Sequence, residues 1–185
     1  MSDIYGPELE RKFMQIADQI EVGEDATISG YASVFGEVDQ GNDLVKKGAY
    51  AASLKQLAAV GTSVKLLWQH DPTQPIGVWD KVFEDEKGLY VSGRLLTETR
   101  KGCEAAALIA AGAIDGLSIG YRTVKADRNQ AGIRHLLELE LWEVSLVTFP
   151  MLQQARVGAK TDPTSEMNEN LAGVFRTLRH SLNAS

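Results

Sequence analysis

The sequence predicts an α+β fold built on a largely antiparallel sheet, which can close into a barrel with helices on its outside. Segments with the two-residue alternation of strands outnumber those rich in helix-forming residues. Short turns join most of the expected strands, which favours antiparallel neighbours over the long crossovers that parallel strands need. Apolar residues make up 44% of the 185 residues and charged residues 24%, values typical of a globular domain with a short tail.

Strand and helix patterns alternate in the first half of the chain. Residues 26–35 alternate small or apolar side chains with polar ones, which predicts a strand. Residues 38–47 are rich in Asp, Asn and Gly and predict a loop. Residues 49–60 are rich in Ala, Leu, Lys and Gln and are followed by Gly61, so we expect a helix that ends at this glycine. A further strand is expected over residues 64–69.

The second half predicts a hairpin, a helix and a pair of long strands. Residues 77–84 and 88–96 form the expected hairpin around an Asp-Glu-Lys-Gly turn. The Ala-rich segment 99–111 predicts the second helix, and residues 117–127 and 133–148 predict the long strands.

We expect the folded domain to span residues 1–160, and residues 161–185 to form a separate tail. Residues 161–170 are polar and predict a linker. Residues 171–182 place Leu, Val and Phe at helical spacing, which predicts a short amphipathic helix. A helix of this length is marginal alone, so it would dock on the body, bind a partner or fray.

Composition and charge exclude several classes of protein. The net charge of −6 argues against a general nucleic-acid binder. No apolar run is long enough to span a membrane, and the first residues lack the basic-then-apolar pattern of a signal peptide. The single Cys103 excludes an internal disulfide or a zinc site of several cysteines, and the three histidines lack close metal-ligand spacing. We therefore expect neither cofactor nor metal, and a reducing, intracellular setting.

Ser118 lies in a G-x-S-x-G motif, the pattern of the strand–serine–helix elbow of α/β-hydrolases. The residues after Ser118 are β-branched and aromatic, so they predict a strand where the elbow needs a helix. Two interpretations stay open. Ser118 is either a nucleophile in another geometry, with glycines that let a substrate backbone approach, or a hydroxyl on a half-buried strand.

His70 closes an apolar strand and precedes the turn marked by Pro72. A base at a strand end is a common arrangement for proton transfer, and the alternative is a histidine that caps the strand. His135, in an expected strand, and His180, in the tail, are weaker choices.

Glu143 lies in an apolar segment and differs in parity from Glu138 and Glu140, which share one strand face. An unpaired buried carboxylate is costly, so Glu143 should have a partner. A histidine would suit catalysis, and the alternative is an ion pair with an arginine such as Arg94, Arg122 or Arg134.

Over about residues 11–158 the chain resembles the prohead maturation proteases of tailed phages. The resemblance rests on the order and spacing of several blocks rather than on any one of them. These blocks are 30–35 (GYASVF), 47–50 (KGAY), 67–71 (LWQHD), 75–77 (PIG), 116–121 (GLSIGY) and 141–150 (LWEVSLVTFP).

The resemblance implies a serine protease similar to the herpesvirus assemblins, which use a Ser-His-His site on a mainly antiparallel β-barrel surrounded by helices. It implies His70 as base, Ser118 as nucleophile and Glu143 as third member, where the assemblins place a histidine. The implied activity is a serine endopeptidase that removes the scaffolding segment of the phage major capsid protein and also cleaves itself. It would act in the host cytoplasm, inside the assembling prohead, as a possible homodimer by analogy with the assemblins.

Two other functions are weighed against this one. The first is a non-catalytic capsid scaffold or docking module on the same fold, against which the intact Ser118, His70 and Glu143 set counts. The second is an unrelated esterase, against which the strand-like sequence after Ser118 counts.

Overall fold

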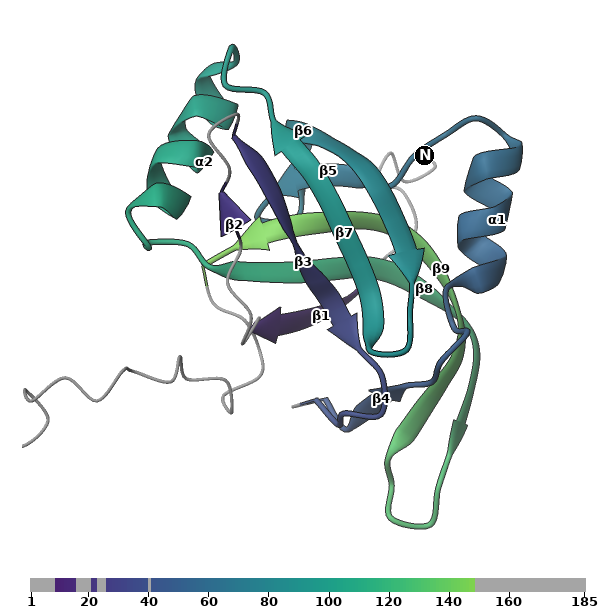
Figure 1. The fold of residues 1–185 in the computed structure, drawn as a ribbon. Helices are drawn as coiled ribbons and strands as arrows, with labels where there is room; N and C mark the ends of the chain where they lie inside the picture. Colours follow the sequence, from purple (N-terminus) through teal and green to yellow (C-terminus); the bar gives the residue numbers. More distant parts are fainter. Residues whose placement is uncertain (1–8, 16–20, 23–25, 40, 149–185) are drawn as a thin grey trace, which may run out of the picture. The chain divides into compact units, whose positions relative to one another are not determined.

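Strands dominate the fold, as Figure 1 shows. The structure is a computed structural model and describes residues 9–15, 21–22, 26–39 and 41–148. The strands of the described residues are β1 (Glu10–Gln15), β2 (Glu21–Val22), β3 (Thr27–Val34), β4 (Asp43–Val45), β5 (Lys65–Trp68), β6 (Asp71–Glu84), β7 (Gly88–Leu95), β8 (Gly116–Arg128) and β9 (Arg134–Val147). The helices of the same residues are α1 (Ala51–Ala59) and α2 (Arg100–Ala110).

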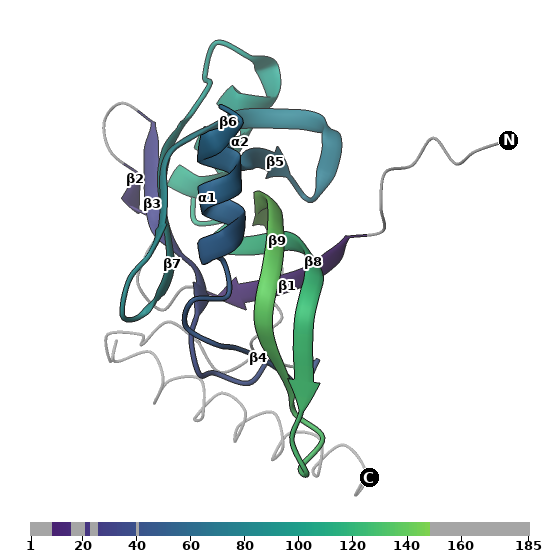
Figure 2. The ribbon, with the colours of Figure 1, turned by 90° about the vertical axis from the view of Figure 1, so that its right-hand side faces the viewer.

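All nine strands belong to one sheet, with the order β1-β8-β9-β5-β6-β7-β3-β2 and with β4 beside β9. Neighbouring strands are antiparallel, except that β4 and β5 both run parallel to β9. The sheet curls into a half-barrel, which Figures 1 and 2 show from two sides. The predicted α+β fold with a largely antiparallel sheet is confirmed.

The hydrophobic core lies on the concave side of this sheet. Along β8, Leu117, Ile119 and Tyr121 are buried in the core, and Val144 and Leu146 join them from β9. Burial of each such side chain stabilises the fold by roughly 1.5–3 kcal/mol relative to exposure. Ser118 alternates with these core residues along β8, so its side chain leaves the strand on the opposite face.

The two helices agree with the predicted segments and pack against different strands. Helix α1 lies beside β9 between the places where β4 and β5 pair with that strand, and the Leu141 N–H donates to Ser53 Oγ at 2.9 Å. Thr99 caps the start of helix α2, since its side chain accepts a hydrogen bond from the Gly102 N–H at 3.0 Å. Helix α2 lies against β6 and β7. In the described part of the chain no helix is long and apolar enough to cross a membrane.

The structure corrects two of the predicted elements. The predicted loop over residues 38–47 contains β4, a short strand that pairs with β9. Strand β6 begins at Asp71 instead of residue 77 and includes Pro72 and Pro75. The β5–β6 pairing shifts register twice in this region. Prolines are tolerated at such irregularities because their missing N–H interrupts no regular ladder there.

Strands β1 and β2 were not predicted, because their short segments carry no clear alternation. Each pairs along an edge of the sheet, with β8 and with β3 respectively. The predicted domain boundary at residue 160, the linker 161–170 and the helix 171–182 lie outside the described residues.

Candidate active site

Ser118 is the third residue of strand β8 and is fully buried. The strand continues to Arg128, so the G-x-S-x-G motif lies within a strand and not at a strand–helix elbow. The esterase interpretation of this motif is therefore wrong. On β9, Ser118 faces Ser145 in the antiparallel register.

His70 lies in the sharp turn between β5 and β6 and is 8% exposed. Because β5 runs parallel to β9, the carboxyl end of β5 and the turn that follows it lie beside Ser145 and Leu146 of β9. The turn places Gln69 at φ 51° and His70 at φ 62°. A left-handed conformation in a residue other than glycine costs on the order of 1–3 kcal/mol, and such strain is concentrated at functional sites.

Hydrogen bonds connect the side chains of Ser118, His70 and Glu143 in a row. His70 Nε2 lies 2.7 Å from Ser118 Oγ. On the other side of the ring, His70 Nδ1 forms a short hydrogen bond with Glu143 Oε1. With the proton on Nδ1, the ring donates to the carboxylate and Nε2 accepts from the serine hydroxyl. This is the order of contacts that a nucleophile, a base and an orienting acid require.

A β-bulge in β9 aims Glu143 at the site. Gly120 of β8 pairs with Glu143, and the next residue, Tyr121, pairs with Leu141, so Trp142 is an extra residue on β9. Leu141 faces the core, and without the bulge Glu143 would face the core as well. The extra residue reverses the parity, so Glu143 lies on the same face as Ser118.

Gly120 provides the space that the Glu143 carboxylate occupies. A Cβ atom at position 120 would lie 2.2 Å from Glu143 Oε1, closer than any non-bonded contact allows. The second glycine of the G-x-S-x-G motif therefore has a local steric role that does not depend on a hydrolase elbow.

The alternative partners of Glu143 are excluded by the ion pairs that the structure shows. Arg94 pairs with Asp80, Arg122 with Glu140, and Arg134 with both Glu10 and Asp43. The prediction that a histidine pairs with the buried Glu143 is confirmed for His70.

Ser145 is a polar residue of this site that the sequence analysis did not identify. Its hydroxyl donates to Glu143 Oε2 at 2.5 Å, and its Oγ accepts from the His70 backbone N–H at 3.2 Å. Its spacing of two residues from Glu143 could have indicated that Ser145 lies near the site, because residues 143 and 145 share a strand face.

Other polar residues named by the sequence lie in different environments. Asp71, next to His70 in the chain, accepts hydrogen bonds from Thr73 and Gln74, and these bonds lower the pKa of its carboxyl group. His135 pairs with Asp127 on the β8–β9 hairpin, and His180 lies outside the described residues. Among the residues that the structure describes, no group of three or more His, Cys, Asp or Glu side chains could hold a metal ion.

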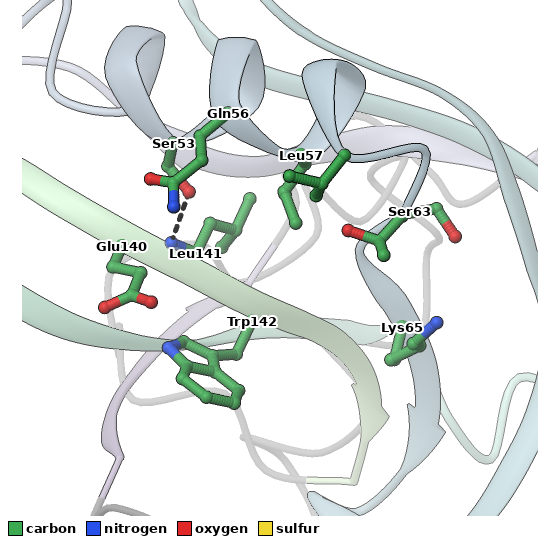
Figure 3. A pocket seen from close by; sticks show the side chains of 10 residues that line it. Ser53, Gln56, Leu57, Ser63, Lys65, Glu140, Leu141 and Trp142 are labelled. Atoms are coloured by element: carbon green, nitrogen blue, oxygen red, sulfur yellow. Dashed lines mark hydrogen bonds between the residues drawn. The ribbon is translucent and has the colours of Figure 1, made fainter.

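A pocket of about 300 Å³ opens next to the bulge, between α1, the start of β5 and β9. Figure 3 shows Trp142 and Glu140 along β9, with Gln56 and Leu57 of α1 across the pocket from them. None of Ser118, His70 and Glu143 lines it. The bulge therefore separates two environments, because Trp142 lines this pocket while its neighbour Glu143 is buried against His70.

Comparison with known proteins yields one family, one protein of similar sequence and one solved structure of similar fold. The sequence profile of the caudovirus prohead serine protease family matches residues 14–170. The prohead protease of Enterobacteria phage HK97 is 32% identical over 140 residues, which cover 74% of this chain and 61% of that protein. This chain thus spans less than two thirds of that relative.

The fold has a counterpart among solved structures. The capsid assembly protease of bacteriophage T4 superposes with a TM-score of 0.64 at 19% sequence identity. The superposition covers 79% of this chain and 100% of that protein, so it supports the fold.

Proposed function

Because this chain belongs to the caudovirus prohead serine protease family, we propose that Ser118, His70 and Glu143 form the catalytic triad of a capsid maturation protease. The observation that carries this proposal is the buried row of hydrogen bonds from Ser118 Oγ through the His70 ring to Glu143. The family's name supplies the reaction class, and the row supplies a nucleophile, a base and an orienting acid in contact.

In the proposed reaction, Ser118 Oγ attacks the carbonyl carbon of the scissile peptide while His70 Nε2 takes the hydroxyl proton. His70 then gives this proton to the leaving amine, and an acyl-enzyme forms. Water, activated by the same imidazole, hydrolyses the ester and restores Ser118. Glu143 holds the ring with its Nδ1–H toward the carboxylate and stabilises the imidazolium that forms twice in each cycle.

The proposed substrate is the scaffolding segment of the phage major capsid protein, cleaved in the assembling prohead within the host cytoplasm, and the protease also cleaves itself. The HK97 and T4 relatives are named for the prohead and for capsid assembly, which favours this substrate over others. A homodimer, and a relation of this half-barrel to the helix-surrounded β-barrel of the assemblins, are further parts of the proposal that rest on the sequence resemblance.

The test is the cleavage of capsid protein, and of the chain itself, by purified wild type and Ser118→Ala. We expect Ser118→Ala to abolish both cleavages and keep the fold, because one lost hydroxyl costs little stability. Ser33→Ala is the matched control, since Ser33 is also a fully buried strand serine and lies on β3, outside the site. It should cleave like wild type, as should Cys103→Ser, whose thiol is exposed.

A folded Ser118→Ala that cleaves at the wild-type rate would refute the proposal. Binding of the scaffolding segment by the wild type without any cleavage would instead favour the non-catalytic docking module.

A further inference from the structure

Ser145 is the polar residue that contacts both partners of Ser118 in the proposed triad. It lies on β9 between the core residues Val144 and Leu146 and is fully buried. Its neighbours across the sheet are Ser118 on β8 and Leu67 on β5. Ser145 therefore lies where the strand that carries the nucleophile and the strand that leads to the base meet β9.

The Ser145 hydroxyl acts both as a hydrogen-bond donor and as an acceptor. The single proton of Ser145 goes to Glu143 Oε2 at 2.5 Å, the carboxylate oxygen that does not face His70. A lone pair of the same oxygen accepts the His70 backbone N–H at 3.2 Å. One atom thus bonds to the acid and to the main chain of the base.

Both bonds restrict groups that would otherwise have freedom to move. With Oε1 at His70 and Oε2 at Ser145, the plane of the Glu143 carboxylate is fixed at two points. The His70 backbone has φ 62°, an unfavourable conformation for a histidine, so it persists only where the surroundings hold it. The Ser145 hydroxyl is one of the groups that hold it.

We propose that Ser145 is a positioning residue of the protease, which sets the carboxylate of Glu143 and the backbone of His70 in the geometry that activates Ser118. This inference rests on the proposed function, because it needs the Ser118–His70–Glu143 row to be catalytic. Ser145 acts through these two residues and takes no part in bond making.

The test measures the rate at which a fluorophosphonate probe labels the full-length chain. In this reaction the Ser118 Oγ–P bond forms, the P–F bond breaks, fluoride leaves and the serine proton passes to His70. The rate thus reports activation of the serine without a known peptide substrate. The variants are Ser145→Ala, which adds no bulk, and the isosteric pair Ser145→Thr and Ser145→Val, which differ only in the hydroxyl.

We expect Ser145→Ala and Ser145→Val to lower the maximal labelling rate on the order of 10–100-fold, as expected for loss of a hydrogen bond to a charged group. The probe concentration at half-maximal rate should stay the same, because the probe's contacts do not change. Ser145→Thr should retain most of the rate.

A spectroscopic measurement separates positioning from a merely structural role. The far-downfield proton NMR signal of a strongly hydrogen-bonded imidazole N–H should be present in wild type and in Ser145→Thr. It should move upfield or disappear in Ser145→Ala, while circular dichroism shows an intact fold.

The outcomes distinguish this inference from the proposed function. If Ser118→Ala abolishes labelling but folded Ser145→Ala labels at the wild-type rate with an unmoved signal, the inference is wrong and the triad stands. If folded Ser118→Ala labels like wild type, the proposed function itself is wrong. Equal losses in folded Thr and Val variants, with wild-type behaviour of Ser145→Ala, would also overturn the inference.

Discussion

At the residue scale, the buried carboxylate of Glu143 faces the ring of His70, which in the proposed reaction becomes a cation when it accepts the proton of Ser118. In a poorly solvated site this charge has a larger effect than it would in water. The assemblins, which the sequence resembles, place a histidine at the position of Glu143, so we expect the charge to help without being indispensable.

We therefore expect a graded series of cleavage rates on one capsid-derived peptide. Ser118→Ala and His70→Ala should be inactive. Glu143→Ala should still cleave, at a rate lower than that of wild type by a factor on the order of 10²–10⁴. Glu143→His should recover part of that loss if the site accommodates the ring.

The control for this series is Glu140→Ala, which removes an acid of the same strand that pairs with Arg122 away from the site. It should cleave like wild type. A folded Glu143→Ala with full activity would mean that the third member lies elsewhere, and Asp71 would be the next residue to test.

The residues of the site were largely readable from the sequence. The flanking glycines indicated Ser118 as a candidate, and the position at a strand end indicated His70. Glu143 became a candidate because a lone buried carboxylate is costly. The resemblance to prohead proteases then selected the catalytic alternative in each case. Ser145 was missed because a serine in an apolar strand has no distinctive pattern until its partners, which come from a distant turn, are known.

At the element scale, the β-bulge of β9 and Gly120 of β8 together decide where Glu143 lies. We expect Gly120→Ala to displace the carboxylate from His70, because the added Cβ would lie 2.2 Å from Oε1. The end of a glutamate side chain can move at little cost to folding. Activity should thus fall on the order of the Glu143→Ala loss, while the free energy of unfolding changes by no more than about 1–3 kcal/mol.

Gly93→Ala is the contrasting variant for this prediction. A Cβ there would meet the backbone carbonyl oxygen of Val78 at 2.2 Å, and a strand backbone cannot move aside like a side chain. It should lose more stability than Gly120→Ala in chemical denaturation. Full activity of a folded Gly120→Ala would show that the position of the Glu143 carboxylate is not critical.

The bulge could have been inferred from one sequence feature. Between residues 139 and 146, the core residues of β9 change from odd positions, Leu139 and Leu141, to even positions, Val144 and Leu146. A strand keeps its parity unless a residue is inserted, so this change indicates an irregularity at 142–143. Its position relative to Ser118 depends on strand register, which is a tertiary property.

An acidic cluster around Arg134 fastens the start of β1 to β8 and β9. Glu10 bonds to Arg134 and to Thr123, and Arg134 also pairs with Asp43 at 2.8 Å. Burial acts to raise the pKa of Glu10, but the hydrogen bonds from Arg134 and Thr123 lower it below the ordinary value of 4.5 overall. The stabilisation by Glu10 should therefore be complete above that value and disappear as the pH falls through the lowered pKa.

We expect Glu10→Gln to be less stable than wild type near neutral pH, by an amount that shrinks to zero in acid. The measurement is the difference in the free energy of unfolding between the two proteins from neutral pH to well below 4.5. A difference that does not depend on pH would contradict the electrostatic explanation. Glu86→Gln, at an exposed ion pair with Lys47, is the control and should change stability little at any pH.

At the scale of the whole molecule, the α+β class and most central elements followed from local sequence patterns. Long alternating segments predicted β3, β7, β8 and β9, and Ala-rich segments that end at glycines predicted both helices. The short strands β1, β2 and β4 escaped prediction because partner strands, rather than their own sequence, stabilise them. The parallel pairing of β5 with β9, which brings His70 to Ser118, is likewise invisible in local patterns.

The central claim is that this half-barrel presents Ser118 as the nucleophile of a protease. The most direct measurement is to treat the active full-length chain with a fluorophosphonate and to locate the adduct by peptide mass spectrometry. We expect one phosphonyl group, on Ser118, together with loss of capsid-protein cleavage, and no adduct on this residue in His70→Ala. An adduct on another residue that abolishes cleavage while Ser118 stays unmodified would contradict the account.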